Sequence, residues 1–287
     1  KTDQHHSTPL AFLSSSYKRL SWLRSTSDAT ARFTTSLQSE WQYLCRCVPG
    51  VEEFLGPVED AIREFFVPAM LQLEAREVSD EFRQFLSHGV KQGGMNIREP
   101  AKSAARLHQS SSEACATLVA SLKGDARLDS MAHAQCVRKA STAARKERVD
   151  AEKVFVESMA ASASRPIKKR LARIGLTGAW ITQMPMKLND TILSKDEFFD
   201  NIRLRYGMRP VNLCDRCDGC GAGFSVEHAL SCQKGGLVCQ RHDDTRDEAG
   251  RLAANSLTKT RVSYEPYIFY GRGVAACIEA GDTSRSG

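Results

Sequence analysis

The chain has 287 residues, which is enough for one large domain or two ordinary ones. Its formal net charge of +6 permits a nucleic-acid partner without requiring one. No apolar run is long enough to cross a bilayer and no signal-peptide core is present, so we expect no membrane partner. No sequence pattern indicates a small-molecule substrate.

The first third of the chain predicts a loose terminus followed by helices. Residues 1–35 are rich in Ser and Thr, which is typical of a loose segment. After Pro57, apolar residues recur at three- and four-residue steps and predict a helix with one buried face. That face consists of Val58, Ala61, Ile62, Phe65, Phe66, Ala69 and Met70. Ser79 is placed to cap a further helix, which ends at Gly93 and Gly94, and an extended segment then runs to Pro100.

Residues 101–163 are rich in Ala and Ser and predict two helices separated near Gly124, the second from about Ser130 to Ser162. Basic residues follow this second helix and continue beyond it. Such a run is usually a solvated face, and the alternative is contact with the phosphate backbone of RNA or DNA. No aromatic residues interleave with them to stack on bases. The candidate nucleic-acid-binding residues here are Arg138, Lys139, Arg145, Lys146, Lys168, Lys169 and Arg170.

Residues 193–198, LSKDEF, have the pattern of a helix N-terminus. Ser194 is the expected N-cap and Glu197 falls at the third helical position, which is the spacing of a capping box. Leu193 and Phe198 are placed to form a hydrophobic staple across this start. We expect the helix to continue its buried face through residue 206 and to end at Gly207.

Ten cysteines are present, and those between residues 214 and 239 lie close together in the sequence while the others are scattered. Clustered cysteines with a nearby histidine indicate metal binding in a reducing compartment, so we expect the nucleus or the cytoplasm.

The stretch CDGCGAGFSVEHALSC, residues 217–232, has the spacing of a zinc site. A tight Cys-x-x-Cys turn places two sulfurs on one side, and Ser225 can cap a short helix whose histidine and last cysteine are four residues apart. The predicted ligands are Cys217, Cys220, His228 and Cys232. Because protein fills all four positions, we expect structural zinc and no activated water.

The ligand register has alternatives. Cys214 precedes the turn, and Cys239 and His242 follow the last predicted ligand, so any of the three can substitute. Beyond them, a helix is expected with His242 on one face, where a histidine is by default structural and hydrogen-bonded. Residues 261–270 then read as strand material, and Asp282 lies among a few acidic residues near the end of the chain.

Several segments together resemble non-LTR retrotransposon polyproteins that carry a restriction-like endonuclease, in the region behind the reverse transcriptase. The most specific segment is CDGCGAGFSVEHALSCQKGGLVCQRHDDTRDE, residues 217–248. LTGAWITQMP, LSKDEFFDNIRLRYG and VKQGGMNIREP are similar to the family's linker helices and Gly-Gly segment. WQYLCRCVPGVEEFLGPVEDAIREFFVPAML is similar to its thumb. The resemblance covers roughly residues 41–287.

The resemblance implies a Cys-Cys-His-Cys zinc knuckle that precedes the nuclease. It also implies that Arg241 and His242 correspond to residues at the start of the nuclease domain, and that Asp282 corresponds to the first carboxylate of the nuclease site. The polymerase aspartates and a second nuclease acidic motif have no counterpart here, so we expect no polymerase activity and no nuclease activity from this chain alone. Magnesium is expected only if a longer chain completes the nuclease.

Together these observations predict a mainly α fold. We expect a loose segment (1–35), a thumb-like helical region (36–100), a basic helical linker (101–210), the zinc knuckle (211–236) and an incomplete α/β nuclease start (237–287). The expected function is that of a retroelement polyprotein fragment that binds zinc and RNA or DNA. Two alternatives are a helical interaction protein with a structural zinc staple, and part of an active metal-dependent endonuclease in a longer chain.

Overall fold

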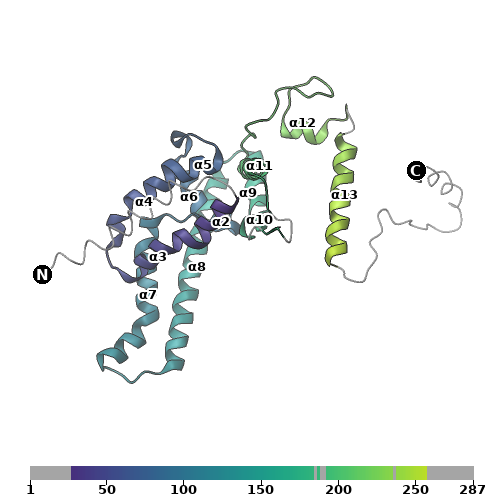
Figure 1. Cartoon of the computed structure of the whole chain (residues 1–287). Helices are drawn as coiled ribbons and strands as arrows, with labels where there is room; N and C mark the ends of the chain where they lie inside the picture. The colour runs from purple at the N-terminus through teal and green to yellow at the C-terminus, as the bar shows by residue number, and fades with distance from the viewer. Residues whose placement is uncertain (1–26, 184–185, 188–191, 235–236, 257–287) are drawn as a thin grey trace, which may run out of the picture. The chain divides into compact units, whose positions relative to one another are not determined.

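A computed structural model describes residues 27–183, 186–187, 192–234 and 237–256 (Figure 1). The chain divides into two compact units, residues 1–211 and 212–287, and each is described by itself. Within the described residues the secondary structure is helical, apart from one isolated antiparallel bridge between Arg216 and Gly223. The predicted mainly α class is therefore confirmed, while the strands expected at 261–270 lie outside the described residues.

No helix in the described part of the chain combines the length and the apolar character needed to cross a membrane.

The first unit begins with a continuous helical stretch made of α2 (Ser27–Arg32), a π-helical turn η1 (Phe33–Leu37) and α3 (Gln38–Cys47). Residues 27–35, which were expected to be loose, are therefore helical. Their order has a physical cause: Phe33 is fully buried, stacks on Phe66 at a ring-centroid distance of 4.3 Å and packs against Trp41. Two aromatic contacts of this kind fix a helix that its polar composition alone does not predict.

The helix expected after Pro57 is present, but its buried face differs from the predicted one. It consists of α4 (Gly56–Ala61), a π-helical turn η3 (Ile62–Phe66) and α5 (Val67–Leu71). From Phe66 onward, the buried residues are Phe66, Val67, Pro68, Met70 and Leu71, whereas Phe65 is 49% exposed. A π-turn inserts one extra residue into the helix, so every later position on the apolar face moves forward by one. The prediction that Phe65 and Ala69 are buried was wrong for this reason.

A buried ion pair joins this helix to the next one. α6 (Asp80–Ser87) begins at the predicted cap, where the Ser79 hydroxyl accepts a hydrogen bond from the Phe82 amide. Arg83 on α6 donates to both carboxylate oxygens of Glu59 at 2.7 and 2.8 Å, and to the carbonyls of Ile97 and Arg98. Arg83 thereby ties the extended segment before α7 to two helices.

Short helical turns fill the connections of this region: η2 (Val51–Phe54), η4 (Ala75–Glu77) and η5 (Val90–Gln92). The helix capped by Ser79 ends at Ser87, earlier than the predicted break at Gly93 and Gly94, and the two glycines instead follow the turn η5. Gly93 has a left-handed φ of 97°, and a Cβ on Gly94 would lie 2.2 Å from the His88 carbonyl oxygen, so no other residue fits there.

The two long helices have the predicted bounds. α7 (Pro100–Lys123) and α8 (Ser130–Ser162) form an antiparallel hairpin that projects from the rest of the first unit (Figure 1). Gly124 ends α7 with a φ of 84°, and the Asp129 carboxylate caps α8. Contacts across the hairpin include a 2.9 Å hydrogen bond between the Thr117 hydroxyl and His133 Nδ1.

The first unit closes with α9 (Arg165–Ile174), α10 (Ala179–Thr182) and α11 (Lys195–Arg205). The predicted capping box of α11 is present, with Ser194 and Glu197 each accepting from the other's amide. At its other end, Arg205 donates to the carbonyl of Ile174, and the Tyr206 hydroxyl donates to the Gly93 carbonyl at 3.1 Å. α11 therefore holds the glycine turn and the end of α9 in place.

The second unit contains α12 (Val226–Ser231) and α13 (Leu237–Ser256), preceded by an irregular loop. Of the predicted nuclease start, α13 is the part that the structure describes. On this helix Val238 is half-buried, whereas Thr245, Ala249 and Leu252, which share a face with His242, are exposed.

Candidate metal centre

The first two predicted ligands lie on a tight loop before α12. The Gly221 amide donates to the Cys217 carbonyl at 2.8 Å, and the Cys217 amide donates to the Ala222 carbonyl at 2.9 Å. These bonds curl the chain so that Cys217 and Cys220 face the same side. Gly221 makes the curl possible because its φ of 72° is in the left-handed region. A Cβ on Gly219 would meet the Lys234 carbonyl oxygen at 3.0 Å, so the second glycine permits a close backbone approach.

The other two ligands are positioned by α12. The Ser225 hydroxyl accepts a hydrogen bond from the His228 amide at 3.0 Å, which is the predicted N-cap. His228 lies in the first turn and Cys232 is the C-cap residue, one helical turn later, so both reach the same side of α12. The Phe224 ring lies edge-on to the imidazole at 6.0 Å and limits its rotation.

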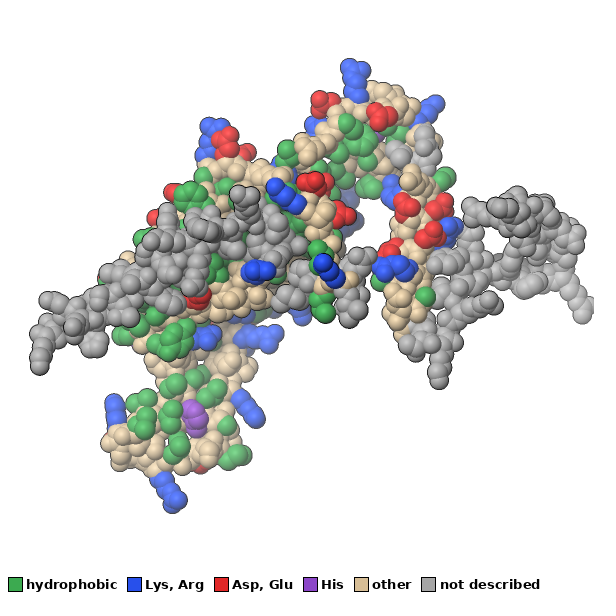
Figure 2. All heavy atoms as spheres, viewed as in Figure 1, with side chains coloured by type: hydrophobic (Ala, Val, Ile, Leu, Met, Phe, Trp, Pro, Cys, Tyr) green, Lys and Arg blue, Asp and Glu red, His purple; other side chains and the backbone are tan. Residues whose placement is uncertain are grey.

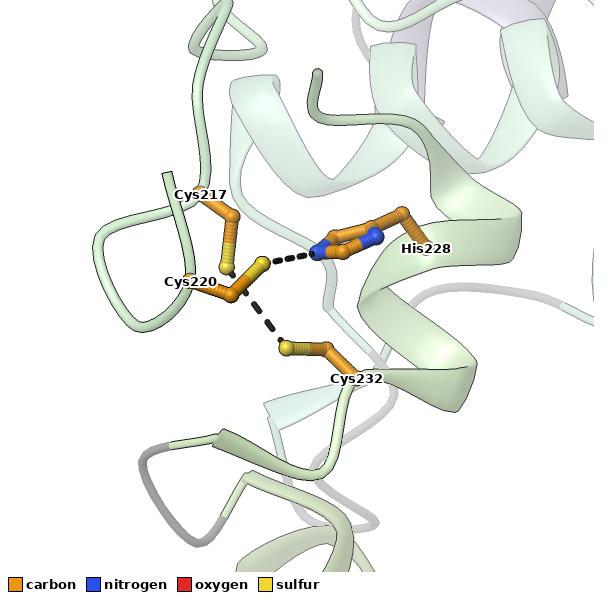
Figure 3. Close-up of side chains that lie close together, drawn as sticks. All are labelled: Cys217, Cys220, His228 and Cys232. Atoms are coloured by element: carbon orange, nitrogen blue, oxygen red, sulfur yellow. Dashed lines mark hydrogen bonds between the residues drawn. The ribbon is translucent and has the colours of Figure 1, made fainter. Parts of the chain in front are cut away.

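The four side chains converge on one point (Figure 3). Cys217 Sγ lies 3.8 Å from Cys232 Sγ, and Cys220 Sγ lies 3.2 Å from His228 Nε2. All four ligand atoms lie within 4.8 Å of one another. With zinc–sulfur bonds of about 2.3 Å, the sulfur–sulfur edge of a zinc tetrahedron is about 3.8 Å. A disulfide has a length of about 2.05 Å, so the Cys217–Cys232 separation fits two ligands of one ion and not a covalent bond.

The electrostatics of the cluster favour a bound cation. Hydrogen bonds from the backbone at Cys220, from the His228 side chain and from the backbone at Gly219 lower the pKa of Cys217 to about 6. At neutral pH this ligand is therefore in the thiolate form that metals bind. At Cys232, a backbone hydrogen bond at Lys234 lowers the pKa, but burial and the neighbouring thiols of Cys217 and Cys220 together raise it by more. A divalent cation among the four ligands would remove this competition between thiols for charge.

The burial pattern of the cluster is that of a small structural site. Cys217 and Cys232 are buried, His228 is half-buried and Cys220 is exposed. The four groups could hold a metal such as zinc, with soft sulfur and imidazole donors and no ligand position left for a reactive water.

The alternative ligands do not join this cluster. Cys214 and Cys239 are exposed, and neither belongs to the group of converging donors found among the described residues. His242 lies on α13 with a side chain 73% exposed, and its Nδ1 is 3.5 Å from an oxygen of Asp243. His242 is therefore exposed on α13, and the structural, hydrogen-bonded role that is the default for a histidine stays a prediction.

The predicted nucleic-acid-binding residues fall into separate groups. Arg138 and Lys139 are exposed on α8, and Lys168 and Lys169 are exposed on α9. Arg170 is instead half-buried, with its guanidinium lying directly over Gly207, where a Cβ would come within 1.9 Å of it.

The remaining candidates lie elsewhere. Arg145 and Lys146 on α8 line cavities beside the helix. Arg241 on α13 donates to the Ala229 carbonyl of α12 at 3.4 Å, so it also connects two helices of the second unit. Asp282 lies outside the described residues.

Sequence reasoning missed a set of arginines that the fold brings together from three places: Arg46 on α3, Arg98 and Arg106 around the start of α7, and Arg148 on α8. Arg145 joins them. Their separations in sequence are large, and only the pair on α8 has a helical spacing, so no local pattern marks the set.

In comparisons with protein-family models, curated proteins and solved structures, nothing matches this chain.

Proposed function

We propose that this chain is the region C-terminal to the reverse transcriptase of a non-LTR retrotransposon polyprotein with a restriction-like endonuclease, and that it binds zinc and nucleic acid. The observation that carries the proposal is the convergence of Cys217, Cys220, His228 and Cys232 within the segment whose sequence most resembles that family. The resembling segments upstream, over residues 41–71, 90–100 and 193–207, add to it.

The zinc has a structural role in this proposal. Its site is closed by four protein ligands, so it fixes the loop of residues 212–225 onto α12 and takes no part in chemistry. In the intact polyprotein the knuckle would act as a joint that orients the polymerase and nuclease parts and contacts the template or target.

Nucleic-acid contact is supported by basic residues that have no internal role. Arg138, Lys139, Lys168 and Lys169 are exposed, and they make no ion pair with other described residues. Lysine and arginine bind phosphates without special spacing, and the affinity depends on salt because counterions are released.

The test is binding of the purified, zinc-loaded chain to labelled RNA and DNA at several salt concentrations. We expect the logarithm of the affinity to fall linearly with the logarithm of salt, and each removed contact to reduce the slope by about 0.7 to 0.9. The variant Lys168→Ala/Lys169→Ala removes two exposed charges. Arg76→Ala/Lys195→Ala, which removes two exposed charges elsewhere in the same unit, is the matched control. No affinity for either nucleic acid at low salt would contradict the proposal.

A helical interaction protein remains the second candidate, because the end of the α7–α8 hairpin carries exposed apolar side chains. Leu122 is 80% exposed and Met131 is 71% exposed. Under this alternative, Leu122→Glu/Met131→Glu abolishes association measured by sedimentation, and the wild-type chain binds no nucleic acid.

Endonuclease activity belongs to a longer chain in this proposal. Asp282 would supply one carboxylate for a magnesium-dependent cleavage whose second carboxylate lies beyond it. A nicking assay on such a longer chain tests this role. Unchanged cleavage by Asp282→Ala removes Asp282 from the mechanism.

A further inference from the structure

Three segments of the first unit enclose a groove of about 510 Å³ whose lining contains five arginines and no acidic residue. α3 contributes one arginine, the segment that starts α7 contributes two, and α8 contributes two. The arginines are Arg46, Arg98, Arg106, Arg145 and Arg148. Figure 2 shows that, on the visible face of the α7–α8 hairpin, blue Lys and Arg side chains predominate over red Asp and Glu.

The internal compensation of this charge is incomplete. Glu152, buried behind the groove, accepts from Arg98 Nη1 at 2.9 Å and lies 3.6 Å from Arg148 Nε. One carboxylate therefore serves two arginines, and it also accepts the Gly89 amide. Within the part of the chain that the structure describes, Arg46, Arg106 and Arg145 form no ion pair.

Two further observations describe the burial and pairing of the groove arginines. Burial, followed by the charge of Arg148, lowers the pKa of Arg98; Arg106 adds to this, and Glu152 only partly opposes it. The Nε atom of Arg148 is buried and has no hydrogen-bond partner among the described residues.

Other arginines of this unit have a different role. Arg83 is saturated by Glu59 and two carbonyls, and Arg203 donates to the carbonyls of Leu71, Gln72 and Arg209. These side chains hold the fold together, as Arg98 also does through Glu152 and the Ser87 carbonyl, whereas Arg46, Arg106 and Arg145 line the groove without an ion pair to another described residue.

The remaining lining defines the ligand. Ser110, Ser111 and Ser141 add hydroxyl donors, Gln42 adds an amide, and no aromatic side chain lines the groove. Arginine, hydroxyl and amide groups are the usual partners of phosphate and sugar oxygens, and the lack of aromatic platforms disfavours binding by base stacking. Arg98, Arg145 and Arg148 also line a second cavity along α8, whose lining is mixed because it includes Lys146 and Lys153 together with Asp150 and Glu152.

We propose that the groove lined by Arg46, Arg98, Arg106, Arg145 and Arg148 binds the phosphate backbone of a double-helical nucleic acid, without reading its sequence. This inference rests on the proposed nucleic-acid function and assigns it to one surface. The surface differs from the exposed lysines of α9, which contribute only general attraction.

The test compares the affinity of the zinc-loaded full chain for a 20-base-pair duplex in RNA and DNA form, and for the corresponding single strands, by fluorescence anisotropy. The variant Arg106→Ala/Arg145→Ala removes two arginines that have no internal partner, so folding should be retained, as checked by circular dichroism. The matched control, Arg76→Ala/Lys195→Ala, removes two charges from other surfaces of the same unit. Arg106→Lys/Arg145→Lys keeps the charge.

We expect the arginine-to-alanine variant to bind duplex about tenfold more weakly at moderate salt, with a salt slope smaller by about 1.8. The control should stay within about twofold of wild type, and the lysine variant should recover most of the affinity and of the salt slope because lysine also neutralises phosphates and releases counterions. Wild-type affinity and slope in the alanine variant would overturn the groove assignment while leaving the proposed function intact. Tighter binding of single strands than of duplex would overturn the choice of ligand. A wild-type chain that binds neither nucleic acid would contradict both proposals, even if it bound inorganic polyphosphate.

Discussion

The Sγ atoms of Cys217 and Cys232 lie 3.8 Å apart, although fifteen positions separate the two residues in the sequence. The Cys217 loop and the end of α12 are brought to this distance by a backbone curl and a capped helix, and both are buried there. Two thiols at this separation, with an imidazole and a third thiol beside them, match the spacing of ligands around one tetrahedral metal ion.

Removal of zinc should unfold the knuckle and leave the first unit folded. The main hydrophobic core lies wholly in residues 33–208, and the knuckle has little buried apolar surface of its own. Small metal-bound folds gain much of their stability from the ion. We expect a strong chelator to change the His228 imidazole signals in NMR spectra, while the thermal transition followed by tryptophan fluorescence stays in place, since all three tryptophans (Trp22, Trp41 and Trp180) belong to the first unit. A shift of that transition on chelation would mean that zinc also stabilises the first unit.

Alkaline pH should destabilise the first unit partly through Tyr206. Burial raises the pKa of this phenol to about 12, from an ordinary value of 10.0, so the folded chain holds the proton more tightly than the unfolded chain. Its contribution to stability is therefore fully present below pH 10 and is lost as the pH rises toward 12.

We expect the unfolding free energy from urea titrations to fall between pH 10 and pH 11.5, and to fall less in Tyr206→Phe. Burial also raises the pKa of Cys45 to about 11, and this second contribution should persist in the variant. Equal pH dependence in wild type and Tyr206→Phe would be evidence against a buried phenol.

Because of the π-turn at η3, we expect Phe66 and Phe65 to contribute unequally to stability, whereas the sequence pattern places both on the buried face. Phe66 is 1% exposed and stacked on Phe33, so Phe66→Ala should cost about 3–5 kcal/mol of unfolding free energy. Phe65 is half-exposed, and Phe65→Ala should cost about 1 kcal/mol or less. Chemical denaturation of the two variants side by side measures the difference. Similar losses for both variants would contradict the π-turn and indicate a regular α-helical register.

The buried pair of Arg83 and Glu59 should be far more important than the exposed pair of Arg63 and Asp80. Arg83→Met leaves a carboxylate and two carbonyls without their donor, and we expect a loss of about 3–5 kcal/mol. Arg63→Met breaks a pair whose members are 38% and 87% exposed, and it should cost about 1 kcal/mol or less. A small loss in Arg83→Met, by the same denaturation measurement, would show that water replaces the missing contacts.

Local sequence signals predicted much of this structure. Gly124, the Ser194–Glu197 capping box and the Ser225 cap each act within one or two helical turns, so the bounds of α7, α8, α11 and α12 could be predicted. The proposed zinc ligands could also be predicted from the sequence, because both halves of the site are local motifs: a Cys-x-x-Cys turn and a helical pair four residues apart.

Features set by tertiary packing could not be predicted from the sequence. The π-turn at η3 depends on Phe66 meeting Phe33, which is far away in the sequence. The arginine groove depends on α3, α7 and α8 lying side by side, and its residues carry no shared spacing. The exposure of His242 likewise depends on what α13 packs against, which helical periodicity does not reveal.

The most direct test is the zinc content of purified protein measured by mass spectrometry of metals. We expect one zinc per chain in the wild type and in Cys214→Ser and Cys239→Ser, and a marked loss in Cys217→Ser. Full zinc content in Cys217→Ser, or a comparable loss in Cys214→Ser, would contradict the ligand set of Cys217, Cys220, His228 and Cys232.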